Sequence, residues 1–266
     1  MILLHPVLHL IVAALYAVAA WARWPRDGAP SRIAGYTWLV PLALVLHAFV
    51  IARAIFRPDG LDVSFVNALS LVAGLAALIA WASGLFRVLP QVAAVVLSMA
   101  AAGVLIHTFG ASPHRFRYSD SPWAVVHIAV ALVAYALFVI AALQALMLTG
   151  LERRLRDGID PAGETPPLLT LERYLFRLVG AGFVLLTLAL ASGFLFSEQL
   201  FGKPVTFTHK NVFSVAGWLA FAILLAGRAR FGWRGRTALR WILGGTLLLV
   251  LGYLGSKFVS EVLLNR

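Results

Sequence analysis

SPWAVVHIAVALVAY, residues Ser121 to Tyr135, opens an apolar segment that runs to about residue 149 and is long enough to cross a membrane as a helix. On a helix, Trp123, His127 and Tyr135 share one face, because they are four and eight residues apart. A histidine at this depth is costly to leave without a partner, since lipid offers no hydrogen bond. The segment therefore predicts a membrane helix in which His127 binds another group.

The composition of the whole chain predicts a membrane protein as well. Of its 266 residues, 61% are hydrophobic and only 12% are charged, which excludes a soluble domain of this length. Cysteine is absent, so the chain itself carries no disulfide, thiolate metal site or thiol redox step. The net charge is +11, but the arginines cluster in short loops between apolar segments. This pattern indicates membrane orientation, with anionic lipid and not nucleic acid as the polyanionic partner.

A span of about 20 apolar residues is the unit from which a membrane topology is built. On this rule the chain contains eight candidate helices, at about residues 2–22, 36–56, 62–83, 89–108, 122–149, 175–199, 211–227 and 237–263. The connection from Gly150 to Tyr174 holds three prolines and mixed charge, which predicts a surface loop. We therefore expect an all-α, polytopic bundle that forms a single integral membrane domain, residues 1–266, with four helices in 1–110 and four in 111–266.

Basic residues concentrate in alternate loops, and this sets the expected orientation. The loops after the first, third, fifth and seventh spans are the arginine-rich ones, and Arg228–Arg240 alone holds five arginines. The positive-inside rule places these loops in the cytoplasm and both termini outside. Six of the seven histidines then map to the outer side, and only His47, in the middle of the second span, is ambiguous. The six are His5, His9, His107, His114, His127 and His209.

Histidines gathered on one side of a membrane suggest metal or cofactor binding. Imidazole binds haem iron, zinc or copper, and it also carries protons. Without cysteine and with few intramembrane carboxylates, a compact structural zinc site is disfavoured. Haem fits better, because it needs one or two histidines and an apolar, aromatic pocket. For each histidine alone, snorkelling at the interface or a hydrogen bond between helices remains the alternative.

Signatures of other functions are missing from the sequence. It contains no HExxH or GxSxG motif and no carboxylate pair at membrane depth, so a hydrolase is not expected. It also lacks a buried acidic relay and a broken-helix repeat, which leaves a small-molecule transporter as the third hypothesis. We expect no conventional enzyme, with any chemistry resting on a cofactor and on partners.

Four motifs in the second half of the chain occur in an order and spacing typical of a known family. They are Trp123-Ala-Val-Val-His127 with Tyr135; Arg173-Tyr174 leading into Val179–Phe183 and Leu190-Ala-Ser-Gly193; Trp218–Arg228 followed by Gly232-Trp233-Arg-Gly235; and Tyr253-Leu-Gly255. Together they resemble the cytochrome c assembly proteins of the CcsA, ResC and CcmC group. The resemblance implies a multi-pass bacterial inner-membrane protein that handles haem at its outer, periplasmic face, with His127 as an axial ligand of the haem iron. It also implies apocytochrome c or other cytochrome c assembly proteins as partners.

The chain departs from the family pattern in two places. Where the family carries Trp-x-Trp-Asp-Pro-Lys-Glu, this chain has VTFTHKN, Val205 to Asn211, and keeps only the lysine and one aromatic residue. The family's second outer histidine would fall near Leu263 and Leu264, so it is missing. The chain is therefore similar to the YpjD and HemX-like branch, which lacks the tryptophan-rich signature.

These patterns give a set of candidate haem-site residues. His127 comes first, followed by His209, His47 and His9, and the candidate aromatic residues are Trp123, Phe207 and Trp218. For the aromatic residues, membership of an interfacial belt is the alternative. Three hypotheses stay open: His209 replaces the lost ligand, haem is five-coordinate, or haem is not bound at all. In the third case the chain would be a haem-free scaffold or regulatory protein that binds a partner through Arg228–Arg240, a loop that otherwise only sets topology.

Overall fold

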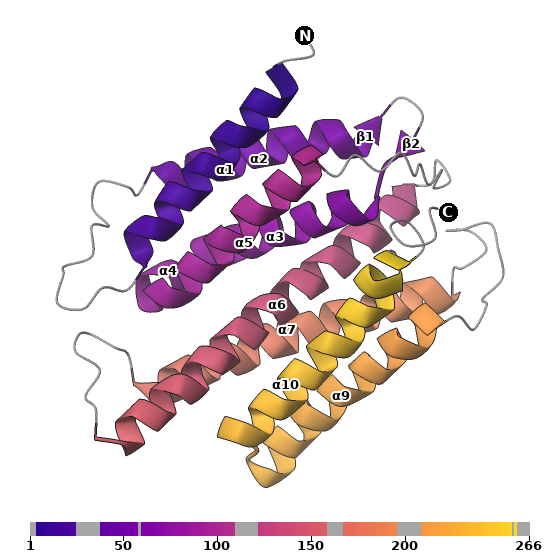
Figure 1. Cartoon of the computed structure of the whole chain (residues 1–266). Helices are drawn as coiled ribbons and strands as arrows, with labels where there is room; N and C mark the ends of the chain where they lie inside the picture. Colours follow the sequence, from indigo (N-terminus) through magenta and orange to yellow (C-terminus); the bar gives the residue numbers. More distant parts are fainter. Residues whose placement is uncertain are drawn as a thin grey trace. The chain divides into compact units, whose positions relative to one another are not determined.

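The computed structural model describes residues 4–24, 38–57, 60–109, 122–158, 167–195, 209–256 and 258–259. These residues are helical apart from short connections and two strands of two residues each, β1 (Phe56–Arg57) and β2 (Gly60–Leu61), which pair antiparallel. The all-α class predicted from the sequence is confirmed (Figure 1). The elements are α1 (Leu4–Arg23), α2 (Leu39–Ile55), α3 (Phe65–Ala82), α4 (Leu85–Val88), α5 (Pro90–Phe109), α6 (Pro122–Arg156), α7 (Leu168–Leu195), α9 (His209–Phe231), α10 (Gly235–Val250) and the π-helical turn η2 (Leu251–Gly255).

The described helices account for all eight predicted spans. Seven of them are long and apolar enough to cross a membrane, with α10 and η2 counted together as one span, and α2 is slightly shorter at 17 residues. A helix satisfies its backbone hydrogen bonds internally, which is the requirement for a chain segment in lipid. The prediction of a polytopic membrane protein is therefore confirmed. The side of the membrane on which the termini lie stays a prediction.

The predicted loop between Gly150 and Tyr174 is wrong at both of its ends. Helix α6 continues to Arg156 and α7 already begins at Leu168. The rule of about 20 apolar residues marks only the part of a helix that lies in lipid. A helix can extend beyond this part into water where its terminal residues are charged. Arg153, Arg154 and Arg156 occupy the last turn of α6, where cations interact favourably with the helix dipole.

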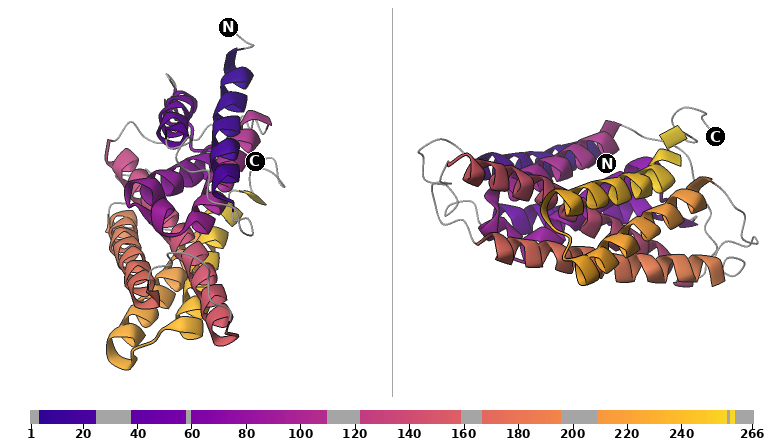
Figure 2. Two further views of the ribbon diagram at one scale, coloured as in Figure 1. Left: turned by 90° about the vertical axis from the view of Figure 1, so that its left-hand side faces the viewer. Right: turned by 90° about the horizontal axis from the view of Figure 1, so that it is seen from below.

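The chain divides into two compact units. Unit 1 comprises residues 1–118 and 257–266, and unit 2 comprises residues 119–256. In unit 1, α1 packs along α5, α5 packs on α3, and α2 lies against α1 and α3 (Figure 1). In unit 2, α6 packs along α7 and α10, and the α9–α10 hairpin adds a further contact between α9 and α7 (Figure 2). The prediction of a single integral membrane domain, with its division near residue 110, stays a prediction.

Glycines in unit 2 make room for a buried aromatic pair. Phe138 of α6 and Phe221 of α9 stack with ring centroids 3.9 Å apart. A Cβ atom at Gly182 of α7 would lie 3.0 Å from the Phe138 ring, and one at Gly245 of α10 would lie 2.9 Å from the Phe221 ring. Close packing over small residues is the usual way in which membrane helices associate. These contacts fix how the four helices of unit 2 face one another, and so they position the side chains described next.

Candidate histidine site in unit 2

His127 lies near the start of α6 and is hydrogen-bonded to α7. Its Nδ1 atom is 2.8 Å from the Oγ atom of Ser192. The Ser192 hydroxyl also donates to the backbone carbonyl of Ala189, at 3.1 Å. A hydroxyl has one proton to donate, so with that proton on Ala189 the oxygen accepts from Nδ1–H of His127. This network assigns the neutral His127 tautomer whose Nε2 atom carries the lone pair.

Gly193, the next residue of α7, lies against the same imidazole ring. A Cβ atom at this position would be 3.3 Å from Cε1 of His127 and 4.0 Å from its Nε2. A larger side chain at residue 193 would therefore crowd the edge of the ring that carries Nε2. Ser192 and Gly193 both belong to the motif Leu190–Gly193, which contributed to the family resemblance without an assigned role. Their contacts supply one: Ser192 orients His127, and Gly193 leaves space beside it.

The first turn of α9 lies near the same site. His209 begins this helix and is exposed, and Lys210 follows it. The ammonium of Lys210 acts electrostatically on His127 and lies 5.3 Å from the centre of the Tyr253 ring. This electrostatic interaction was missed at the sequence level, because it depends on how α9 packs. The prediction that His209 is a second haem ligand stays a prediction, and Phe207 lies outside the described residues.

The two candidate tryptophans have different surroundings. Trp123 lies one turn before His127 and is 73% exposed. Trp218 is half-buried between helices: its indole N–H donates to Oγ1 of Thr187 at 2.9 Å, and its ring stacks on Phe183 with centroids 5.5 Å apart. Trp218 therefore ties α9 to α7, whereas Trp123 presents its ring outside unit 2. A role for either residue in haem packing stays a prediction.

The π-helical turn η2 contains the motif Tyr253-Leu-Gly255 and lies against α6, the helix that carries His127. The hydroxyl of Tyr135 on α6 donates to the carbonyl of Leu249 at 2.9 Å, just before η2, and the rings of Tyr135 and Tyr253 are 5.8 Å apart. A Cβ atom at Gly252 would lie 3.0 Å from Cβ of Phe213 on α9. Isolated π-helical turns occur frequently at functional sites. Motifs far apart in the sequence thus meet around the helix that carries His127.

The remaining predicted histidines lie in unit 1. His47 is buried, with Nδ1 3.2 Å from the hydroxyl of Tyr16 and Nε2 3.0 Å from the hydroxyl of Ser70. Ligation of iron by His47 would have to replace one of these two hydrogen bonds. His9 is also buried, and its ring lies beside that of His107, which the sequence analysis did not select. Within the described residues, no group of three or more histidine, aspartate or glutamate side chains is placed to hold a metal ion.

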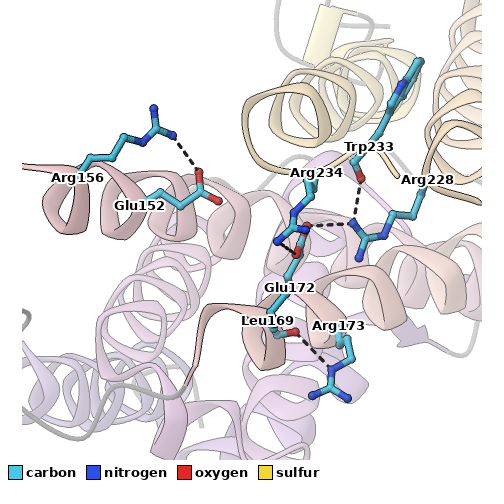
Figure 3. A network of polar contacts seen from close by, with 8 residues as sticks. All are labelled: Glu152, Arg156, Leu169, Glu172, Arg173, Arg228, Trp233 and Arg234. Carbon is cyan, nitrogen blue, oxygen red and sulfur yellow. Dashed lines mark hydrogen bonds and ion pairs between the residues drawn. The ribbon is translucent and has the colours of Figure 1, made fainter. Parts of the chain in front are cut away.

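The predicted basic loop is largely helical and is held by a buried carboxylate. Helices α9 and α10 leave a connection of three residues, 232–234. Glu172 of α7, which is only 6% exposed, binds Arg228 at 3.1 Å and Arg234 at 3.6 Å (Figure 3). Arg228 also donates to the carbonyl of Trp233, at 3.2 Å. Glu172 was missed at the sequence level, because it falls in the predicted surface loop from Gly150 to Tyr174.

Long apolar helices around an oriented histidine define the class of this molecule: it is a multi-pass membrane protein with a candidate ligand-binding imidazole. The model of the family described as "Cytochrome C assembly protein" matches residues 37–264, and the chain belongs to this family. The predicted resemblance is therefore confirmed.

Similarity to individual proteins follows the same pattern. The chain is 30% identical over 270 residues to the "Inner membrane protein YpjD" of Escherichia coli (strain K12), covering 97% of this chain and 99% of that protein. It is 27% identical over 142 residues to the "Cytochrome c biogenesis protein CcsA" of Chlamydomonas reinhardtii, covering 53% of this chain and 40% of that one. No solved structure matches. The predicted likeness to the YpjD branch, and the predicted placement in a membrane, are confirmed.

Proposed function

We propose that this chain is an inner-membrane cytochrome c assembly protein that binds haem at its outer face, with Nε2 of His127 as an axial ligand. The observation that carries the proposal is the hydrogen bond from Nδ1 of His127 to Ser192. A metal-ligating histidine usually donates its second ring N–H to an oxygen, which fixes the tautomer and the orientation of the ring. His127 has this arrangement, so its donor atom fits haem iron.

The surroundings of His127 fit the same ligand. Gly193 keeps bulk away from the edge of the ring that carries Nε2, and Trp123 offers an exposed aromatic face one turn away. Lys210 adds positive charge near His127, which suits the carboxylate groups of haem propionates. In this proposal haem is cargo: the chain binds haem and passes it, with its iron, to a partner protein. The chain's own residues bind and orient it, and His209 is the proposed second ligand.

Two further observations support the location and the partners. The arginine-rich loops predict that the His127 end of α6 faces the outside. Relatives of this chain are named as an inner membrane protein and as cytochrome c biogenesis proteins, which supports apocytochrome c or other assembly proteins as partners. The alternative, a haem-free scaffold that binds a partner through Arg228–Arg240, is less favoured because Arg228 and Arg234 already bind Glu172.

The test is the absorption spectrum of the detergent-purified full chain, as isolated and after addition of haemin. We expect a Soret band that is lost or shifted in His127→Ala and is retained in His114→Ala, which removes another predicted outer histidine. His209→Ala should change the band if His209 is the second ligand. A protein that takes up no haemin, or a His127→Ala variant with an unchanged spectrum, would overturn the proposal and favour the haem-free scaffold.

A further inference from the structure

Two histidines meet in unit 1, whereas His127 belongs to unit 2. His9 lies in the second turn of α1 and is 7% exposed, and His107 lies in the last turn of α5. Their ring centroids are 5.0 Å apart, and their planes are tilted by 31°. The two helices pack along each other, so the imidazoles come together at one end of this helix pair. We propose that His9 and His107 form a chelating site for a divalent transition-metal ion of the zinc and copper class.

The separation of the two rings fits chelation of one ion. With a metal–nitrogen bond of about 2.0–2.1 Å, a bound metal lies roughly 3 Å from each ring centroid. When one nitrogen of each ring is directed at the ion, centroids 5.0 Å apart correspond to a nitrogen–metal–nitrogen angle of roughly 100–110°, which is close to tetrahedral. Two axial ligands on opposite faces of a haem would instead need ring centroids roughly 6 Å apart. The pair as it stands therefore favours a single bent chelate over a haem sandwich.

The kind of ion follows from the ligand atoms. Imidazole nitrogen suits zinc, copper and nickel in their divalent states, whereas magnesium and calcium prefer oxygen. The chain has no cysteine, so it offers no thiolate to select a softer ion. Within the described residues, no third histidine, aspartate or glutamate is placed to complete a metal site with this pair, so in this proposal water supplies the remaining ligands. The site is thus an exchangeable one with open positions, unlike a closed structural zinc site.

Buried contacts fix the positions of α1 and α5 on the side of the histidine pair that faces the middle of each helix. Tyr16, seven residues after His9 on α1, reaches His47 at 3.2 Å, and His47 reaches Ser70 of α3 at 3.0 Å. Gly103, one turn before His107 on α5, packs so closely that a Cβ atom there would lie 3.2 Å from Cα of Ser70. Helix α5 is therefore packed directly on α3, and α1 is tied to α3 through His47 of α2. A site on rigid, packed helices is preorganised, so little ordering remains when the metal binds.

The test is a metal titration of the untagged, chelator-treated full chain in detergent, because a polyhistidine tag would bind the same ions. Addition of Co²⁺ should give the visible absorption bands of a bent, near-tetrahedral site at one ion per chain, and Zn²⁺ should displace it. His9→Gln and His107→Gln should each weaken binding by at least about tenfold, and the double variant should abolish it. Far-ultraviolet circular dichroism and gel filtration would check that the variants fold.

Two controls separate this inference from the proposed haem site. His127→Ala should retain full Co²⁺ binding, and His107→Gln should retain the Soret band, because His127 and His107 lie in different units. In the unmutated chain, Zn²⁺ should protect His9 and His107 from acylation by diethyl pyrocarbonate, as read by mass spectrometry. An absence of saturable Co²⁺ binding, or binding that survives in the double variant, would overturn the inference.

Discussion

Replacing Ser192 by alanine tests the link between the geometry of His127 and its proposed role. The substitution removes the acceptor that His127 uses at 2.8 Å, while the imidazole itself remains. Loss of a hydrogen-bond partner behind a ligating histidine typically weakens metal affinity by about 10- to 100-fold. This corresponds to roughly 1.4–2.8 kcal/mol, and the low end agrees with the net value of about 0.5–1.5 kcal/mol for one hydrogen bond. We therefore expect Ser192→Ala to weaken haemin binding by about tenfold without abolishing it.

Titration with haemin, followed at the Soret band, measures this change directly. Ser83→Ala is a matched control, because the Ser83 hydroxyl also donates to a carbonyl three residues earlier, that of Ala80, at 3.2 Å. Ser83 lies in unit 1 and orients no candidate ligand. The Ser83→Ala variant should therefore bind haemin with the same affinity as the unmutated chain. Equal affinities for Ser192→Ala and Ser83→Ala would refute the argument that Ser192 positions a ligand.

Two further substitutions test the packing that supports the site, with unfolding in sodium dodecyl sulfate as the measurement. Glu172→Gln should destabilise the chain by about 1–3 kcal/mol, because it leaves two arginines without their buried carboxylate. The control, Glu152→Gln, breaks only a surface ion pair with Arg156 and should cost less than about 1 kcal/mol. Gly182→Ala should destabilise by about 1–3 kcal/mol, because its Cβ would lie 3.0 Å from the Phe138 ring. Gly180→Ala, which meets nothing within 4 Å, should be neutral or stabilising by up to about 1 kcal/mol. Equal effects within either pair would contradict the packing described here.

The membrane spans were predictable because hydropathy depends only on local sequence. Every predicted span has its helix, and the largest errors fall where α6 and α7 extend into the loop predicted from Gly150 to Tyr174. Apolar residues report how much of a helix lies in lipid, but not where the helix ends in water. Arginines in the last turn of α6 stabilise that extension, and the sequence rule counted the same arginines as loop residues.

Contacts between helices were much less predictable than the helices themselves. His127 stood out from its sequence position, but its partner Ser192 is 65 residues away, and their meeting depends on the rotation of α6 against α7. Likewise, the ring contact between His9 and His107 was not predicted. The observed partner of the His9 ring is His107, because α1 packs along α5, which is distant in sequence. Hydropathy predicts how long a helix is within lipid. The rotation of the helix about its own axis depends on small residues and on hydrogen bonds to neighbouring helices.

His47 and His127 show how the surroundings of an imidazole separate two roles. Both histidines use Nδ1 in a hydrogen bond to a hydroxyl, Tyr16 for His47 and Ser192 for His127. The Nε2 atom of His47 is bound to Ser70, and a Cβ atom at Gly74 would lie 2.8 Å from the ring, so this imidazole is enclosed within unit 1. Beside Nε2 of His127, by contrast, lies a glycine at the end of α7, where the ring is only half-buried. Depth in the membrane suggested function for both residues, but an axial ligand also needs space beside its second ring nitrogen. This requirement makes His127 the stronger candidate, although its sequence position is no more unusual than that of His47.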